Sequence, residues 1–157
     1  MISEHIDFVL MHEKELERQI KETRLDNGRG GHTGGNSSGH SWVSDPTAIQ
    51  AIRAASNVPC VYVPFGPYTC GERDTKLIRN PEKWLKVARL TRRYYASHKQ
   101  MNIYYASRYK QGEFWRTTCE ALSISKAVYY AMRDDIIHYA SMCAVGMGLL
   151  HPYSKFC

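Results

Sequence analysis

The stretch 113–133 constrains the fold of this chain most strongly, because it contains two helical patterns separated by a short polar corner. In the first pattern, small and apolar residues recur at helical spacing over 113–122 and predict one inward face. They are Phe114, Thr118, Ala121 and Leu122. Ser123 and Ile124 form the corner, and Ser125 is predicted to cap the second helix, since its hydroxyl can accept a backbone N–H that the helix leaves unpaired.

The second helix is also predicted to be amphipathic. Its inward face comprises Ile124, Val128, Met132 and Ile136, and its outward face comprises Lys126, Ala127, Tyr130 and Arg133. This arrangement is typical of a helix-turn-helix, in which the second helix enters the DNA major groove and the first crosses the backbone. Two helices joined by a polar corner are also common in all-α proteins that bind no DNA, so that alternative stays open.

A DNA-binding helix pair would divide its contacts between bases and phosphates. We expect Ser125, Lys126 and Tyr130 to face base edges, with Ala127 on the same surface. We expect Arg116, Thr117 and Arg133 to hold phosphates.

Charge is distributed unevenly along the chain. The whole sequence carries a net charge of +6, whereas the segment 81–133 alone has 11 basic and 3 acidic residues. A basic segment that also contains a groove-sized helix is typical of nucleic-acid binders. A solvated helical surface is the simpler alternative.

The remaining chemistry indicates an intracellular protein without enzymatic activity. The five cysteines form no CxxC pair, and the N-terminus is amphipathic and acidic, unlike a secretory signal. The apolar run 142–150 is too short to span a bilayer. Asp134 and Asp135 are adjacent and would point apart on a helix, and Cys119 is predicted to be an inert core thiol. We therefore expect no catalytic set, metal site or cofactor.

The N-terminal region 1–26 is predicted to be one amphipathic helix. Its apolar stripe comprises Ile2, Ile6, Val9, Leu16 and Ile20. Such a helix either packs on its own domain or serves as an oligomerisation arm, and the sequence leaves both alternatives open. Region 27–43 is rich in glycine and is predicted to be a flexible linker, with His32 and His40 solvated.

Region 44–157 is predicted to be a helical domain. Helices are expected after Asp45-Pro46, after Asn80-Pro81 and over 100–110, with an extended segment at 58–65 and a loop at 66–80. The region 134–150 either continues the second helix of the helix-turn-helix or restarts after a bend. In the helix after Pro81, the inward residues are Trp84, Leu85, Ala88, Thr91 and Tyr95, and the outward residues are Lys83, Lys86, Arg89, Arg92 and Arg93. The predicted fold class is all-α: a helical bundle with a C-terminal helix-turn-helix.

The order of these elements, together with Ser44-Asp-Pro-Thr-Ala48 and Leu122-Ser-Ile-Ser-Lys-Ala-Val-Tyr-Tyr130, resembles the RinA-type late-gene transcription regulators of bacteriophages and prophages. Members of that family end in a helix-turn-helix similar to the promoter-reading region of sigma factors. The resemblance implies sequence-specific binding of double-stranded promoter DNA in the cytoplasm of a bacterial host. The chain departs from such readers at Ala127 and Ala131, where polar or basic side chains are frequent.

Two alternatives come from other functional classes. A small terminase-like packaging subunit also combines a helix-turn-helix with an oligomerisation segment, and it would form a ring of many subunits. A module that binds RNA polymerase would show little affinity for DNA. A homodimer or larger assembly is expected if the apolar faces of 1–26 and 136–149 pair between chains rather than within one.

Overall fold

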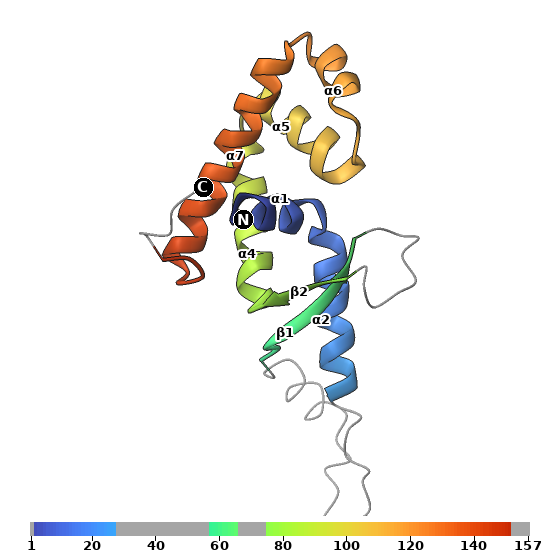
Figure 1. Cartoon of the computed structure of the whole chain (residues 1–157), viewed down its shortest axis with the longest axis vertical. Helices are drawn as coiled ribbons and strands as arrows, with labels where there is room; N and C mark the ends of the chain where they lie inside the picture. Colours follow the sequence, from blue (N-terminus) through green and yellow to red (C-terminus); the bar gives the residue numbers. More distant parts are fainter. Residues whose placement is uncertain (1, 28–56, 66–74, 152–157) are drawn as a thin grey trace, which may run out of the picture. The chain divides into compact units, whose positions relative to one another are not determined.

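A computed structural model describes residues 2–27, 57–65 and 75–151 of the chain (Figure 1). The structure is mostly helical, with one small antiparallel sheet. The predicted glycine-rich linker and the helix expected after Asp45-Pro46 lie outside the described residues.

The described chain divides into two compact units, which do not follow the boundaries expected from the sequence. One contains the described residues of Met1–Lys14 and Glu82–Cys157, and the other contains those of Glu15–Pro81. The beginning of the chain therefore belongs with its C-terminal helices rather than forming a separate arm.

The N-terminal region forms two helices and not the single predicted one. Helix α1 (Ile2–Met11) ends at a turn, and α2 (Glu13–Asn27) begins after it. At the break, both the backbone N–H and the ring Nδ1 of His12 lie within hydrogen-bonding distance of the Phe8 carbonyl, at 3.0 and 2.8 Å. The His12 ring also stacks on the Phe8 ring, with centroids 4.1 Å apart. A side chain bonded to its own helix competes with the next backbone bond, which accounts for the interruption.

Most of the predicted N-terminal stripe is buried within the chain itself. Ile6, Val9, Leu16 and Ile20 are all buried, and Ile2 is half-buried. In the larger unit, α1 packs against α7 (Lys126–Gly146) and against η2 (Ala106–Gln111). The stripe is thus covered without a second chain, and the homo-oligomer stays a prediction that needs another surface.

The smaller unit contains α2 and a two-stranded sheet formed by β1 (Cys60–Pro64) and β2 (Thr75–Arg79). The extended segment predicted at 58–65 is confirmed as β1, whereas the loop predicted at 66–80 is wrong where β2 forms. Val61 pairs with Ile78 and both are buried, while the next pair along, Tyr62 and Leu77, is exposed. This alternation is the two-residue period of a strand with one covered face.

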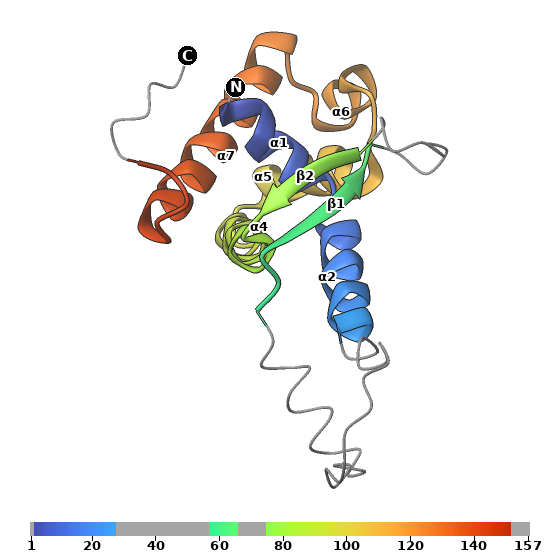
Figure 2. The same cartoon turned by 60° about the horizontal axis from the view of Figure 1, so that its bottom comes forward.

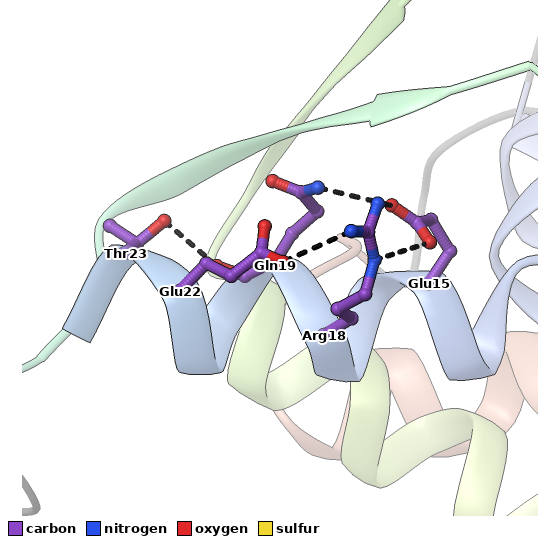
Figure 3. Close-up of polar contacts among 5 residues, drawn as sticks. All are labelled: Glu15, Arg18, Gln19, Glu22 and Thr23. Carbon is purple, nitrogen blue, oxygen red and sulfur yellow. Dashed lines mark hydrogen bonds and ion pairs between the residues drawn. The ribbon is translucent and has the colours of Figure 1, made fainter. Parts of the chain in front are cut away.

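Polar side chains on the exposed side of α2 pair with one another (Figure 3). The Arg18 guanidinium donates to both carboxylate oxygens of Glu15, at 2.9 and 2.6 Å, and to Glu22 at 3.0 Å. The hydrogen bond and charge of Glu15 raise the pKa of Arg18. Lys21 pairs with Glu17 at 2.8 Å. These spacings are the i, i+3 and i, i+4 neighbours of a helix, so α2 neutralises much of its own positive charge.

Helix α4 (Pro81–Tyr95) follows the sequence prediction closely. All five predicted inward residues are buried, and all five predicted basic residues are exposed. Its hydrogen bonds with α7 show that the two helices run antiparallel. Lys83 donates to the Met147 carbonyl at 3.1 Å, whereas Tyr95 donates to the Asp135 carbonyl at 3.1 Å. Figures 1 and 2 show α4 beside the C-terminal half of α7, away from the α6–α7 turn.

The helix predicted at 100–110 consists of α5 (Lys99–Tyr105) followed by the π-helix η2. It ends at Gly112, which has a positive φ of 69°, as expected for a glycine after a helix. Helix α6 (Trp115–Leu122) comes next, and α7 continues without a break to Gly146.

Candidate nucleic-acid interface

The turn between α6 and α7 is defined by backbone hydrogen bonds. Ser123 has φ 55° and ψ 43°, the left-handed conformation that glycine adopts most readily. Its N–H donates to the Glu120 carbonyl at 3.2 Å, and the Ile124 N–H donates to the Cys119 carbonyl at 3.0 Å. These two bonds form the Schellman motif, which satisfies carbonyls that the helix end leaves unpaired. Ser123 therefore ends α6 in a backbone conformation that glycine adopts more often than serine.

Ser125 caps α7, as the sequence predicts. Its backbone is extended, and its side-chain oxygen accepts a hydrogen bond from the Val128 N–H at 3.3 Å. Because the oxygen is engaged in the cap, the hydroxyl proton is the group that can donate to a ligand.

The exposed surface around the turn brings together four of the aromatic and basic side chains of α6 and α7. We call Trp115, Arg116, Lys126 and Tyr130 the Trp115 cluster. The Lys126 ammonium lies 5.0 Å from the Trp115 ring centroid and 6.0 Å from that of Tyr130. The Arg116 guanidinium lies 5.3 Å from the Trp115 ring on the same helix. Cations over aromatic faces are attracted by the ring quadrupole, so the rings hold two positive charges in place at the turn.

Other predicted contact residues border this cluster. Thr117 and Ala127 are exposed, as are the capping Ser125 and the cluster members Arg116, Lys126 and Tyr130. Six of the seven predicted DNA-contacting residues are thus accessible at one end of the helix pair. Sequence reasoning did not select Trp115, although an aromatic residue next to an arginine at a helix start could have suggested it.

The predicted inward faces are partly wrong. Val128 is 44% exposed, and its neighbour Tyr129, at 1%, is buried instead, followed by Met132 and Ile136 as predicted. On α6, Thr118 is buried as expected, but Phe114 is 63% exposed and Ala121 is also exposed. The buried face of α7 is therefore rotated by one residue near its start, and the apolar side chains of Phe114 and Val128 remain exposed.

Arg133 does not have the exposed position that the sequence predicts. Its side chain is only 25% exposed, and its Nε lies 3.5 Å from Oδ2 of Asp7 on α1. This pairing turns the guanidinium toward the protein, so Arg133 does not belong to the surface formed by the Trp115 cluster.

Asp7 is the centre of a partly buried polar network that sequence reasoning missed. Its side chain is 13% exposed. Arg108 Nη2 donates to Asp7 Oδ2 at 2.7 Å, and the Tyr109 hydroxyl donates to Oδ1 at 2.9 Å. Arg108 also donates through Nη1 to the Tyr129 hydroxyl at 2.8 Å. The network connects α1 to η2 and to the first turns of α7, and the only signal in the sequence is a carboxylate beside the apolar stripe.

Burial and charge act in opposite directions on the arginine of this network. Burial lowers the pKa of Arg108, but the adjacent Asp7 carboxylate outweighs that effect and raises it. For Tyr109, burial raises the pKa and the negative charge of Asp7 raises it further. Both groups therefore keep the protons with which they bond to Asp7.

Three consecutive side chains of the π-helix η2 pack against other helices. Ser107 and Tyr109 are buried and Arg108 is partly buried, so all three face other elements. The Ser107 hydroxyl lies 2.6 Å from that of Thr118 on α6 and also donates to the Glu113 carboxylate. The wider turn of a π-helix lets neighbouring residues share one broad face, and such turns are frequent at functional sites.

Asp134 and Asp135 mark the far boundary of the exposed surface on α7. Both are exposed, one turn beyond Tyr130 and Ala131. A negatively charged ligand is therefore favoured at the first two turns of α7 and disfavoured beyond them.

Among residues 2–27, 57–65 and 75–151, no group of three or more His, Cys, Asp and Glu side chains is arranged to hold a metal ion. No helix within the same residues has the length and apolar character needed to cross a membrane. Cys119 is buried in α6, as expected for a core thiol.

Comparisons with protein-family models, with curated proteins and with solved structures found no match to this chain.

Proposed function

We propose that the chain binds double-stranded DNA through α6, the turn at Ser123 and the first turns of α7, and that it regulates transcription of phage or prophage late genes. In this proposal, α7 enters the major groove and α6 crosses the phosphate backbone. The resemblance of the segment from Leu122 to Tyr130 to RinA-type regulators supports the transcriptional role, which would be performed in the cytoplasm of a bacterial host.

The observation that supports DNA binding best is the Trp115 cluster. Arg116 and Lys126 come from different helices, yet both lie within 5.3 Å of the same indole ring. Pre-positioned cations lose less conformational entropy when they meet a phosphate backbone. Arg116 and Thr117 are assigned to phosphates, and Ser125, Lys126, Ala127 and Tyr130 are assigned to the groove.

Other positive surfaces of the described chain are less suitable. The arginine and lysine side chains at positions 18 and 21 of α2 are paired with carboxylates of their own helix. On α4, Arg92 pairs with Glu13 at 2.8 Å, and Lys83 donates to the Met147 carbonyl at 3.1 Å. Neither surface presents a helix end comparable to the capped start of α7.

The test is the salt dependence of binding to a mixed-sequence DNA duplex, measured by fluorescence anisotropy. We expect affinity to fall as salt rises, because bound phosphates release their counterions. Arg116→Ala combined with Lys126→Ala should weaken binding, and the lost phosphate contact of Arg116 should reduce the slope of log K against log salt by about 0.9.

A matched control removes the same number of charges elsewhere. Arg93→Ala combined with Lys99→Ala changes two exposed cations outside the Trp115 cluster and should leave the slope nearly unchanged. Equal losses in the two double variants would exclude α6–α7 as the principal contact surface, and an absence of salt-dependent binding by the unsubstituted chain would refute DNA binding.

A second candidate function is binding of RNA polymerase. The exposed side chains of Phe114 and Val128 favour it, because apolar residues beside aromatic and basic ones are typical of protein contact surfaces. Binding of purified polymerase that persists at salt concentrations where DNA affinity is lost would support this alternative. Association of two copies of the chain also stays a proposal.

A further inference from the structure

The first two turns of α7 expose mainly hydrocarbon. Ala127, Val128 and Ala131 are exposed and end in methyl groups. Lys126 and Tyr130 are the exposed residues of this stretch with polar ends, and the Lys126 ammonium is directed over the Trp115 and Tyr130 rings. The stretch 126–131 contains no arginine, asparagine or glutamine.

This composition limits how bases can be read. Arginine and lysine identify guanine by paired hydrogen bonds, and asparagine and glutamine identify adenine in the same way. Arg133, the next arginine along α7, is partly buried and lies 3.5 Å from Asp7. Beyond Ala131, the exposed carboxylates of Asp134 and Asp135 would approach phosphates and be repelled. Lys126 is therefore the one exposed side chain of the stretch 126–131 suited to paired hydrogen-bond readout, and its ammonium lies over the Trp115 and Tyr130 rings.

Apolar groups can nevertheless distinguish bases in the major groove. Thymine is the base that presents a methyl group there, at C5, and alanine side chains and other apolar groups contact it favourably. A methyl-bearing surface bounded by cations at one end and carboxylates at the other fits a short run of base pairs rather than a long groove contact.

We propose that α7 recognises DNA through thymine C5-methyl groups, which contact Ala127, Val128 and Ala131. This inference rests on the proposed DNA-binding function and specifies its ligand as a half-site with thymines at defined positions. Removing a contacted methyl group from the DNA should weaken binding about fourfold, the effect expected for exposing roughly one buried methylene-sized group.

The experiment begins with the full chain and a random pool of DNA duplexes, from which bound sequences are selected. Each thymine of an enriched duplex is then replaced in turn by uracil, which keeps its base pairing and lacks the methyl group. We expect thymine at recurring positions and about fourfold weaker binding after replacement at those positions. Replacing the thymine at such a position by 5-methylcytosine, which keeps a methyl group at C5, should weaken binding less than replacing it by unmethylated cytosine does.

Protein variants connect the effect to α7. Val128→Thr replaces one exposed methyl group by a hydroxyl, and Ala127→Ser adds a hydroxyl to an exposed methyl carbon. Both positions are exposed and both changes of volume are small, so the fold should be retained. Each should reduce the ratio of affinities for the thymine and uracil duplexes. Ala96→Ser, at an exposed alanine in the connection after α4, is the matched control and should leave the ratio unchanged.

The outcomes separate this inference from the proposed function. Sequence-selective, salt-dependent binding with equal affinity for thymine and uracil duplexes would overturn methyl recognition and leave DNA binding intact. Salt-dependent binding without any enriched sequence would also overturn it. A chain that binds no duplex at any salt concentration would overturn both.

Discussion

At Asp7, two arginine side chains and one tyrosine hydroxyl converge on a single carboxylate. Both partners of the shorter ion pair are mostly buried, with 13% of the Asp7 side chain and 15% of the Arg108 side chain exposed. Taking such charges out of water is costly, and the cost is offset only while the partner and its hydrogen bonds are present. Asp7 thus contributes to stability mainly because its removal would leave Arg108 and Tyr109 of η2 and Arg133 of α7 without their partner.

We predict that Asp7→Asn lowers the free energy of unfolding by about 3 kcal/mol, because the buried Arg108 charge loses its counter-charge. Urea unfolding followed by circular dichroism measures the change. Asp134→Asn removes an exposed carboxylate from the same unit and should change stability by less than about 0.5 kcal/mol. Similar small effects of the two substitutions would mean that the network contributes little.

At the scale of elements, local periodicity predicted α4 residue by residue, because its apolar and charged residues separate cleanly on two faces. Local periodicity failed where contacts with a distant part of the chain determine the structure of a segment. β2 exists through its pairing with β1, and its own sequence has only Ile78 buried. Tyr129 and not Val128 is the inward residue, and its hydroxyl accepts a hydrogen bond from Arg108, a contact between separate elements that local periodicity does not include.

In the candidate site, too, the features set by nearby sequence could be predicted and those set by distant contacts could not. The cap at Ser125 and the exposed residues Arg116, Thr117, Lys126 and Tyr130 could be predicted, since capping and solvent exposure depend mainly on nearby sequence. The burial of Arg133 could not, because it depends on Asp7 in an element more than a hundred residues earlier.

The turn between α6 and α7 contains a local strain that can be removed. Ser123 occupies the left-handed region, which costs a residue with a side chain about 1 kcal/mol and costs glycine little. We therefore predict that Ser123→Gly raises the free energy of unfolding by up to about 1 kcal/mol, as measured by urea unfolding. Ser97→Gly, in the exposed connection between α4 and α5, should give no gain because Ser97 does not have a positive φ. Equal responses at the two positions would contradict this account of the turn.

At the scale of the whole molecule, the larger unit is rich in buried tyrosine. Burial is the main cause that raises the pKa of Tyr95 to about 12, with a smaller contribution from Asp135. Burial also raises the pKa values of Tyr104, Tyr105 and Tyr109 above their ordinary value of 10.0. These phenols are neutral when buried, and burial disfavours their ionised forms.

This packing predicts alkaline unfolding. Because the folded pKa values exceed the unfolded value, the unfolded chain loses its phenolic protons first. The stabilising contribution is therefore complete below about pH 10 and is lost as the pH rises through the folded values, beginning with Tyr95 near 12. Urea unfolding at a series of alkaline pH values measures this decline.

Tyr95→Phe tests one member of the set. It should reduce the loss of stability between about pH 10 and 12, at some cost at neutral pH because the hydroxyl no longer donates to the Asp135 carbonyl. Tyr130→Phe, which removes an exposed phenol, should leave the alkaline decline nearly unchanged. A decline that is the same in the chain and in Tyr95→Phe would exclude Tyr95 as a source.

The pairing of Asp7 with Arg108 also has a consequence for biosynthesis. The two residues are separated by 101 positions, so α1 leaves the ribosome long before the elements that cover it have been made. At translation rates of roughly 5–20 residues per second, the wait is on the order of 5–20 s. During that time α1, which contains the buried Ile6, Val9 and Leu10, has none of its final partners in η2 and α7. We therefore expect the nascent N-terminal helix to bind chaperones that hold apolar segments until synthesis is nearly complete.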